Sequence, residues 1–252
     1  MVVSVLIPVF NEPVSLLKAC VLSIQTQTYD NFEVLLLVEA LSGEANDFIE
    51  RLTKSDCRFH KISIPLGTGL AGSLNVGLNK ARGRFVARMD VDDVSLCRRF
   101  EMQVAFLNRH PNIDVVGSSV LDLVTGRLIQ FPTSHESICA KLKFVNPICH
   151  PSVMFRRDVV LAVGAYDQSF RAAEDLELWL RCASFDVEFA NLSTPLLEYR
   201  MPESPRSWLN WKENIRARRK HAHLFGCISV FLVTNLLLVY GFICAGRRMI
   251  RG

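Results

Sequence analysis

The sequence lacks the patterns that assign many chains to a class at first reading. It has no CxxC pair and no Cys/His spacing typical of zinc sites, although it contains 8 cysteines. It has no Walker-type phosphate loop and no GxGxxG motif after a strand, which argues against an ATPase and a dehydrogenase. Glycine (13) and proline (10) are sparse in the 252 residues and 50% are apolar, which excludes collagen-like, low-complexity and disordered classes. We therefore expect a globular domain with a sizeable core.

The cysteines and the first residues bear on the compartment. Most cysteines lie in apolar runs, where cysteine packs as a small hydrophobic residue, and we expect reduced thiols in a compartment that faces the cytosol. The start, from Met1 to Phe10, lacks a basic segment, and Pro8 interrupts its short apolar run. This pattern predicts a buried first strand rather than a signal peptide.

Charge is distributed unevenly along the chain. Residues 1–205 carry 20 basic and 24 acidic residues, whereas the part from Arg206 onward carries nine basic residues and one acid. A mildly acidic body with a basic end argues against a nucleic-acid partner, which would require a basic surface on the fold itself. It indicates instead a domain whose C-terminal end faces a membrane.

A long apolar run, from Leu224 to Gly246, has no charged residue and is flanked by basic clusters. As a helix its 23 residues would span about 34 Å at ~1.5 Å each, enough for a hydrocarbon core of roughly 30 Å. The alternatives are a transmembrane pass, a helix lying in the cytosolic leaflet and a buried helix of a soluble domain. We expect attachment to the cytoplasmic face of the inner (cell) membrane. The predicted parts are a domain over 1–205, a basic juxtamembrane helix over 206–223, a membrane helix over 224–246 and a basic tail over 247–252.

The first 110 residues alternate between apolar runs and helical patterns. Continuous β-branched runs predict buried strands, and residues at helical spacing follow them. Such alternation predicts an α/β fold with a mostly parallel sheet flanked by helices. The second half is more mixed, with a hairpin expected from 113–123 and 127–131. The predicted strands of the first half are Val2–Phe10, Phe32–Val38, Arg58–Ile64 and Arg84–Met89.

Three carboxylates follow the fourth predicted strand, in the stretch Asp90-Val91-Asp92-Asp93. The carboxyl ends of the strands are where ligands bind in open α/β sheets. Carboxylates one residue apart can share a divalent cation, and hard oxygen ligands suit Mg²⁺ or Mn²⁺. The alternative is an acidic turn that caps the helix beginning near Leu96.

These pieces, taken in order, resemble the inverting, nucleotide-sugar-dependent glycosyltransferases of family 2, which have the GT-A fold. The likeness covers roughly residues 1–201 and is closest to small bacterial enzymes of lipopolysaccharide, capsule and exopolysaccharide synthesis. The matching stretches are VSVLIPVFNE (3–12), SIQTQTY (23–29), Asn75, Gly77, Gly83, RMDVDD (88–93), NP (146–147), HPSVMFR (150–156), GAYD (164–167) and EDLELWLR (174–181).

The resemblance implies roles on the donor side of a site. Pro8, Phe10 and Glu12 would line the pocket for the nucleotide base and ribose. Asp92 would bind the Mg²⁺ or Mn²⁺ that holds the donor diphosphate, and Asp90 would contact the ribose or give a second contact.

It also implies roles on the acceptor side. Asp175 matches the general base that takes the proton of the acceptor hydroxyl, although Glu174 and Asp175 could simply complement the dipole of a helix start. Trp179 and Arg181 match a segment that supports the acceptor and the pyrophosphate, and core packing is the alternative for Trp179. His150 is a further candidate on this side, with a structural role as the alternative.

One position departs from the family pattern. Members usually carry an acidic pair at the end of the second strand, where an aspartate contacts the nucleobase, and here only Glu39 remains. A glutamate could still accept a hydrogen bond from a base, so Glu39 is the expected contact, and a weakened donor site is the alternative.

The resemblance implies transfer of a hexose from a nucleoside-diphosphate sugar, expected to be UDP-linked, to a saccharide acceptor. We expect that acceptor to be lipid-linked, in bacterial cell-surface polysaccharide synthesis. One alternative is a catalytically silent scaffold that acts through its membrane tail. Another is a sugar nucleotidyltransferase, which would require a glycine-rich, arginine-containing loop where this chain has Asn11-Glu12-Pro13.

Overall fold

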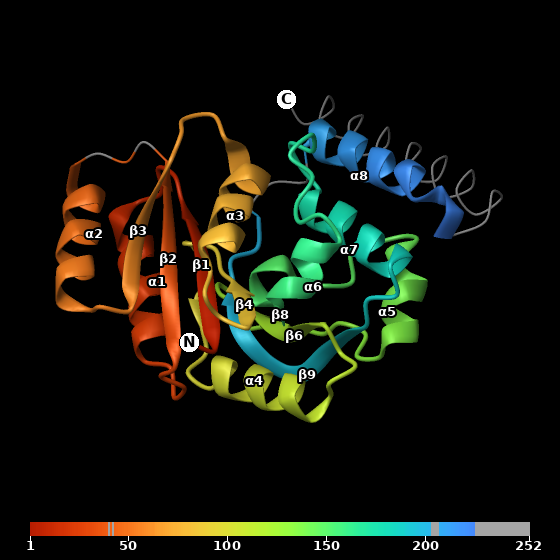
Figure 1. Cartoon of the computed structure of the whole chain (residues 1–252), viewed down its shortest axis with the longest axis horizontal. Helices are drawn as coiled ribbons and strands as arrows, with labels where there is room; N and C mark the ends of the chain where they lie inside the picture. The colour runs from red at the N-terminus through yellow and green to blue at the C-terminus, as the bar shows by residue number, and fades with distance from the viewer. Residues whose placement is uncertain (40, 42, 203–206, 225–252) are drawn as a thin grey trace.

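The chain folds around one mixed β-sheet. The computed structural model describes residues 1–39, 41, 43–202 and 207–224. Within them nine strands form the sheet: eight follow the order β3-β2-β1-β4-β8-β6-β9-β5, and the ninth, β7, pairs with β6 (Figure 1). The strands are β1 (Val3–Val9), β2 (Phe32–Glu39), β3 (Phe59–Ile64), β4 (Phe85–Arg88), β5 (Val94–Ser95), β6 (Val115–Asp122), β7 (Leu128–Ile129), β8 (Met154–Arg156) and β9 (Phe189–Tyr199). The helices are α1 (Val14–Gln25), α2 (Gly43–Ser55), α3 (Gly69–Lys80), α4 (Arg99–Arg109), α5 (His135–Leu142), α6 (Arg157–Ala162), α7 (Glu174–Ser184) and α8 (Trp208–Lys220), with short 3₁₀ turns η1 (His150–Ser152) and η2 (Ala222–Leu224).

The first half of the sheet is parallel, as the sequence predicted. β1 pairs in parallel with β2 and β4, and β2 pairs in parallel with β3. Every residue of β1 is buried, because Leu17 and Ile24 of α1 pack into the core on one face and Leu74 and Leu78 of α3 pack on the other. The carboxyl ends of these strands therefore meet at one edge of the sheet.

The second half corrects the expectation of a mostly parallel sheet. β8 runs antiparallel to β4 and β6, β5 runs antiparallel to β9, and β9 runs parallel to β6. The expected hairpin is present as β6 and β7, and Gly126 in its turn has a left-handed φ of 70°. The strand–helix alternation that keeps neighbours parallel loses its regularity after α4, so the sheet is mixed.

The basic helix expected over 206–223 is present as α8, but it is packed into the domain. In Figure 1 it lies along α7, at the opposite end of the molecule from α2. The guanidinium of Arg218 donates to the main-chain oxygens of Leu142 and Lys143 at 3.3 and 2.9 Å. These contacts join α8 to the end of α5. The buried residues of α8 are Glu213, Asn214, Ala217 and Arg218.

The membrane prediction falls mainly on other residues. Among the residues that the structure describes, no helix has both the length and the apolar character needed to cross a membrane. Apart from Leu224, the helix expected over 224–246 and the tail over 247–252 lie outside the described residues.

Candidate active site

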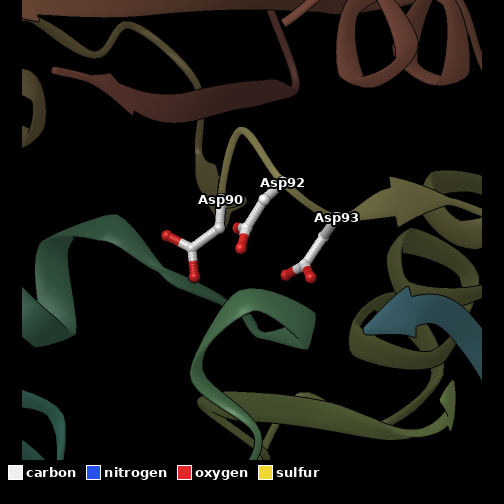
Figure 2. Close-up of side chains that lie close together, drawn as sticks. All are labelled: Asp90, Asp92 and Asp93. Atoms are coloured by element: carbon white, nitrogen blue, oxygen red, sulfur yellow. The ribbon is translucent and has the colours of Figure 1, made fainter. Parts of the chain in front are cut away.

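Three carboxylates lie on the loop that connects β4 and β5. Figure 2 shows Asp90, Asp92 and Asp93 projecting from this loop toward the same side. One oxygen of each lies within 4.8 Å of the other two. Asp90 also forms an ion pair with Arg88, the last residue of β4, whose side chain is buried. The cluster thus lies at the strand end where the sequence predicts a cation site.

Burial makes the charged form of this cluster costly. Asp93 is 1% exposed; its Oδ1 accepts a hydrogen bond from the main-chain nitrogen of Arg200 at 2.8 Å, and its buried Oδ2 has no partner among the described residues. Burial, reinforced by Asp90, raises the pKa of Asp93 to about 8, and the same two causes raise the pKa of Asp92. A divalent cation would offset this crowding, and carboxylate oxygens are its preferred ligands. The residues present therefore fit Mg²⁺ or Mn²⁺.

The residues expected to contact the nucleotide lie at the same edge. Pro8 is near the end of β1, and Glu12 accepts a hydrogen bond from the main-chain nitrogen of Phe10 at 2.9 Å, which holds the turn after that strand. Glu39 ends β2, and its Oε1 accepts from the nitrogen of Gly67 at 2.5 Å. Its Oε2 is buried without a hydrogen-bond partner in the described part of the chain, so this atom has acceptor capacity left for a ligand.

A cavity of about 730 Å³ lies beside the acidic loop. Its walls include Arg88 and Asp90 from the end of β4, and Glu174 and Asp175 from the start of α7. Of the three loop carboxylates only Asp90 lines it. The cavity therefore lies between the expected base and the acidic loop.

Asp175 is held by a donor on each oxygen. The main-chain nitrogen of Leu176 donates to Oδ1 at 2.7 Å, and the side-chain amide of Asn146 donates to Oδ2 at 2.6 Å. The amide oxygen of Asn146 accepts from the nitrogen of Ile148 at 3.3 Å, which orients its NH₂ group toward Asp175. Ala173 before α7 has a left-handed φ of 57°, an uncommon conformation for alanine and one that is concentrated at functional sites. The resemblance included Asn146 without a role, and its contact with Asp175 is visible only in the fold.

Glu174 differs from its neighbour in environment. Burial, and next the charge of Asp175, raise the pKa of Glu174 well above its usual range. Two adjacent carboxyl groups that cannot both ionise cheaply divide into a protonated and an ionised member. The arrangement suits a site in which one of the pair accepts a proton.

The other residues expected on the acceptor side have structural contacts. His150 lines the cavity and lies 2.8 Å from the hydroxyl of Tyr166, and burial, with the charge of Arg88, lowers its pKa well below 6.5. Trp179 is 0% exposed and packs edge-on against His150 with ring centroids 6.0 Å apart, so it lies in the core. Arg181 pairs with Glu177 at 2.7 Å and donates to two main-chain oxygens of the loop after α6. Neither Trp179 nor Arg181 lines the cavity.

Comparison with known proteins identifies relatives of this chain. The family described as Glycosyl transferase family 2 matches residues 4–163. The amylovoran biosynthesis glycosyltransferase AmsE of Erwinia amylovora is 31% identical over 224 residues, covering 86% of this chain and 84% of that protein.

Two solved structures share the fold at low identity. S. aureus TarS 1–349 in complex with UDP-GlcNAc has a TM-score of 0.72 at 17% identity and covers 94% of this chain and 72% of that one. The mannosyltransferase PcManGT from Pyrobaculum calidifontis, in complex with GDP-Man and Mn²⁺, has a TM-score of 0.68 at 18% identity and covers 99% of this chain and 75% of that one. The likeness extends to 39% of a longer S. aureus TarS structure.

Proposed function

The chain belongs to glycosyl transferase family 2 and is a glycosyltransferase of GT-A-like fold, and from that premise we propose a specific reaction. It transfers a hexose with inversion from a nucleoside-diphosphate sugar to a saccharide acceptor, and UDP-hexose is the expected sugar donor. Asp175 is the general base. The observation that carries this proposal is the cavity between Asp175 and the acidic loop.

The proposed displacement needs opposite functions on the two sides of the sugar. The acceptor oxygen forms a bond to the anomeric carbon, and the bond from that carbon to the diphosphate oxygen breaks. The acceptor proton passes to Asp175, whose carboxylate is oriented by Leu176 and Asn146. The diphosphate leaves on the side of the acidic loop. Inversion follows because attack and departure occur on opposite faces.

A divalent cation would be held by Asp92, with Asp90 and Asp93 beside it. When bound, it stabilises negative charge on the leaving diphosphate. Arg88, which is buried, fixes the orientation of Asp90 through their ion pair. The PcManGT complex with GDP-Man and Mn²⁺ supports a metal-dependent donor site in this fold.

The acceptor proposed is a lipid-linked saccharide of bacterial cell-surface polysaccharide synthesis, met at the cytoplasmic face of the inner membrane. It is supported by the relative named for amylovoran biosynthesis and by the charge-free run from Leu224 to Gly246 with basic flanks. Deletion from residue 225 onward keeps α8 and should release the protein into the soluble fraction of cells that express it. A truncated protein that still sediments with membranes would contradict attachment through this run.

Binding calorimetry tests the donor site directly. Purified protein is titrated with UDP, GDP, dTDP and CMP, each with and without Mn²⁺, and we expect micromolar, Mn²⁺-dependent binding of UDP. Asp92→Asn is the matched variant, because it keeps the size of the side chain and removes its charge. Binding of another nucleotide instead of UDP would assign a different base to the sugar donor, and Glu39 would be the residue to substitute next. If the folded protein bound none of the four, the chain would be a silent scaffold and the proposed transfer would be wrong.

A further inference from the structure

The cavity wall includes residues beyond the part that matches the family. Asn210 and Asn214 both line the cavity, and both come from α8, whereas the family match ends at residue 163. They are four residues apart and so lie on one face of the helix. Their side chains therefore face the same space as Asp175.

The orientation of both amides follows from Arg218. The guanidinium of Arg218 donates to Oδ1 of Asn214 at 3.2 Å, and a guanidinium has no acceptor, so this contact identifies the oxygen of Asn214. The NH₂ group of Asn214 must then be the side that faces Asn210. It donates to the main-chain oxygen of Asn210 at 2.8 Å and to its Oδ1 at 2.9 Å.

The contact with Asn214 also fixes which side of the Asn210 amide carries the oxygen and which carries the NH₂ group. Because its side-chain oxygen accepts from Asn214, its NH₂ group points away from that contact, and no hydrogen bond joins this NH₂ group to another residue in the described part of the chain. Asn210 is partly exposed, whereas Asn214 is 8% and Arg218 3% exposed. The two buried residues thus hold a partly exposed amide with two N–H donors at the cavity wall.

The neighbouring surface fits a sugar. Tyr199 and Met201 line the same cavity and offer apolar surface, while Asn210 offers donors for hydroxyl oxygens. A cavity lined by both apolar surface and oriented polar side chains suits a ligand that carries hydroxyl groups. The nucleotide-sugar is proposed to bind at the ends of β1, β2 and β4. It therefore does not account for the N–H groups that Asn210 presents from α8.

We propose that Asn210 donates a hydrogen bond to a hydroxyl of the acceptor saccharide, and that Arg218 and Asn214 orient it for this purpose. The inference rests on the proposed function and extends it, because it assigns acceptor recognition to α8. Asn210 is a binding residue, and Asn214 and Arg218 are positioning residues.

The test measures the acceptor KM with two sets of probes. The first set is the octyl glycosides of glucose, galactose and N-acetylglucosamine, and the second is the same three sugars linked to the octyl chain through a diphosphate. Asn210→Ala should raise the KM of the acceptor that the wild type uses by roughly 3- to 10-fold, the worth of one neutral hydrogen bond. The dissociation constant of UDP should not change. Lys212→Ala is the matched control, because Lys212 is an exposed residue of α8 that does not line the cavity, and it should resemble the wild type.

The variant Asn214→Asp tests whether the orientation of the Asn210 amide matters, because it leaves Asn210 itself unchanged. An aspartate keeps the size and the contact with Arg218 but has no N–H, so the amide of Asn210 should turn its donors toward it and present oxygen to the cavity. We expect the acceptor KM to rise as in Asn210→Ala, although Asn210 is intact.

The possible failures are distinct. An unchanged acceptor KM in Asn210→Ala would overturn the binding role of Asn210. A KM that rises in Asn210→Ala but not in Asn214→Asp would overturn the orienting role of Asn214. Weaker UDP binding in Asn210→Ala would assign Asn210 to the donor instead. If the wild type binds UDP but glycosylates no probe, the saccharide assignment of the cavity is wrong. Failure of the proposed function itself would appear earlier, as absence of nucleotide binding by the wild type.

Discussion

Glu177 provides a strict test of how the cavity walls are held together. Its side chain is fully buried on α7, and its carboxylate lies 2.7 Å from Arg181, 2.7 Å from Lys220 and 3.1 Å from His221. Burial alone raises the pKa of Glu177, but hydrogen bonds from these three side chains outweigh burial and hold that pKa far below its usual range. Because α7 carries Asp175 and α8 carries Asn210 and Asn214 of the same cavity wall, this carboxylate joins two parts of the site.

The change Glu177→Gln keeps the size of the side chain and removes its charge. Removing one partner of a buried ion pair costs roughly 3–5 kcal/mol, because the other charge stays buried without compensation. Here two of the cations have further acceptors: Lys220 contacts Asp167 at 2.7 Å, and Arg181 donates to two main-chain oxygens. We therefore expect the free energy of unfolding to fall by about 3 kcal/mol, the lower end of that range.

Urea unfolding at neutral pH measures this loss, with Glu44→Gln as the control. Glu44 also pairs with a lysine, Lys18 at 2.8 Å, but its side chain is 65% exposed, so solvent screens the pair and we expect no measurable change. If Glu177→Gln unfolded at the same urea concentration as Glu44→Gln, burial of the charge would not matter and the reasoning would be refuted.

The same variant has a distinct pH dependence. A carboxyl whose pKa is lowered by folding contributes stability that is present above the unfolded pKa, near 4.5, and is lost as pH falls through the folded value. The wild type should therefore lose stability below about pH 4.5 more steeply than Glu177→Gln. Parallel curves for the two proteins in that range would show that Glu177 is not the group responsible.

Three further changes test the reaction. Asp92→Ala should abolish the Mn²⁺ dependence of UDP binding in calorimetry without changing the circular dichroism spectrum, and retained metal-dependent activity would contradict its role as a ligand. Asp175→Asn should leave the UDP dissociation constant unchanged and lower kcat by ~10²–10⁴-fold, as for loss of a general base, so near-normal turnover would place the base elsewhere. Asn146→Ala should lower kcat by roughly 10-fold and move the acidic limb of the pH–rate profile upward, because the amide stabilises the carboxylate form of Asp175. A lower rate with an unmoved profile would indicate only a structural role for Asn146.

The first half of the fold could be predicted because its signals are local. A strand covered on both faces requires a continuous apolar run, and β1 and β2 have such runs. The position of the acids after β4 could also be predicted, because the strand before them is recognisable in the sequence. Ligands bind at the carboxyl ends of the strands in open α/β sheets, so these acids could be proposed as a site from the sequence, and the family resemblance then gave Asp90 and Asp92 their expected roles.

The second half could not be predicted to the same extent because its signals are interrupted. Residues 187–190 and 196–200 predict two short strands, with Pro195 just before the second. The structure joins them into β9, where irregular pairing with β6 at Ser118 and Ser119 accommodates the proline. Apolar periodicity also gave no sign that α8 is packed into the domain, because Glu213, Asn214 and Arg218 make up most of its buried face.

The division of the site between segments has a consequence for specificity. The contacts assigned to the donor come from the ends of β1, β2 and β4, whose positions are set by a sheet buried on both faces. The cavity is completed by the start of α7, the end of β9 and residues of α8. The ion pair of Glu177 with Lys220 joins α7 to α8, and Arg218 joins α8 to the end of α5. A substitution on α8 can therefore alter the cavity wall while the sheet that positions the donor stays intact. The acceptor should accordingly be the more easily changed of the two substrates, and α8 is the element in which to change it.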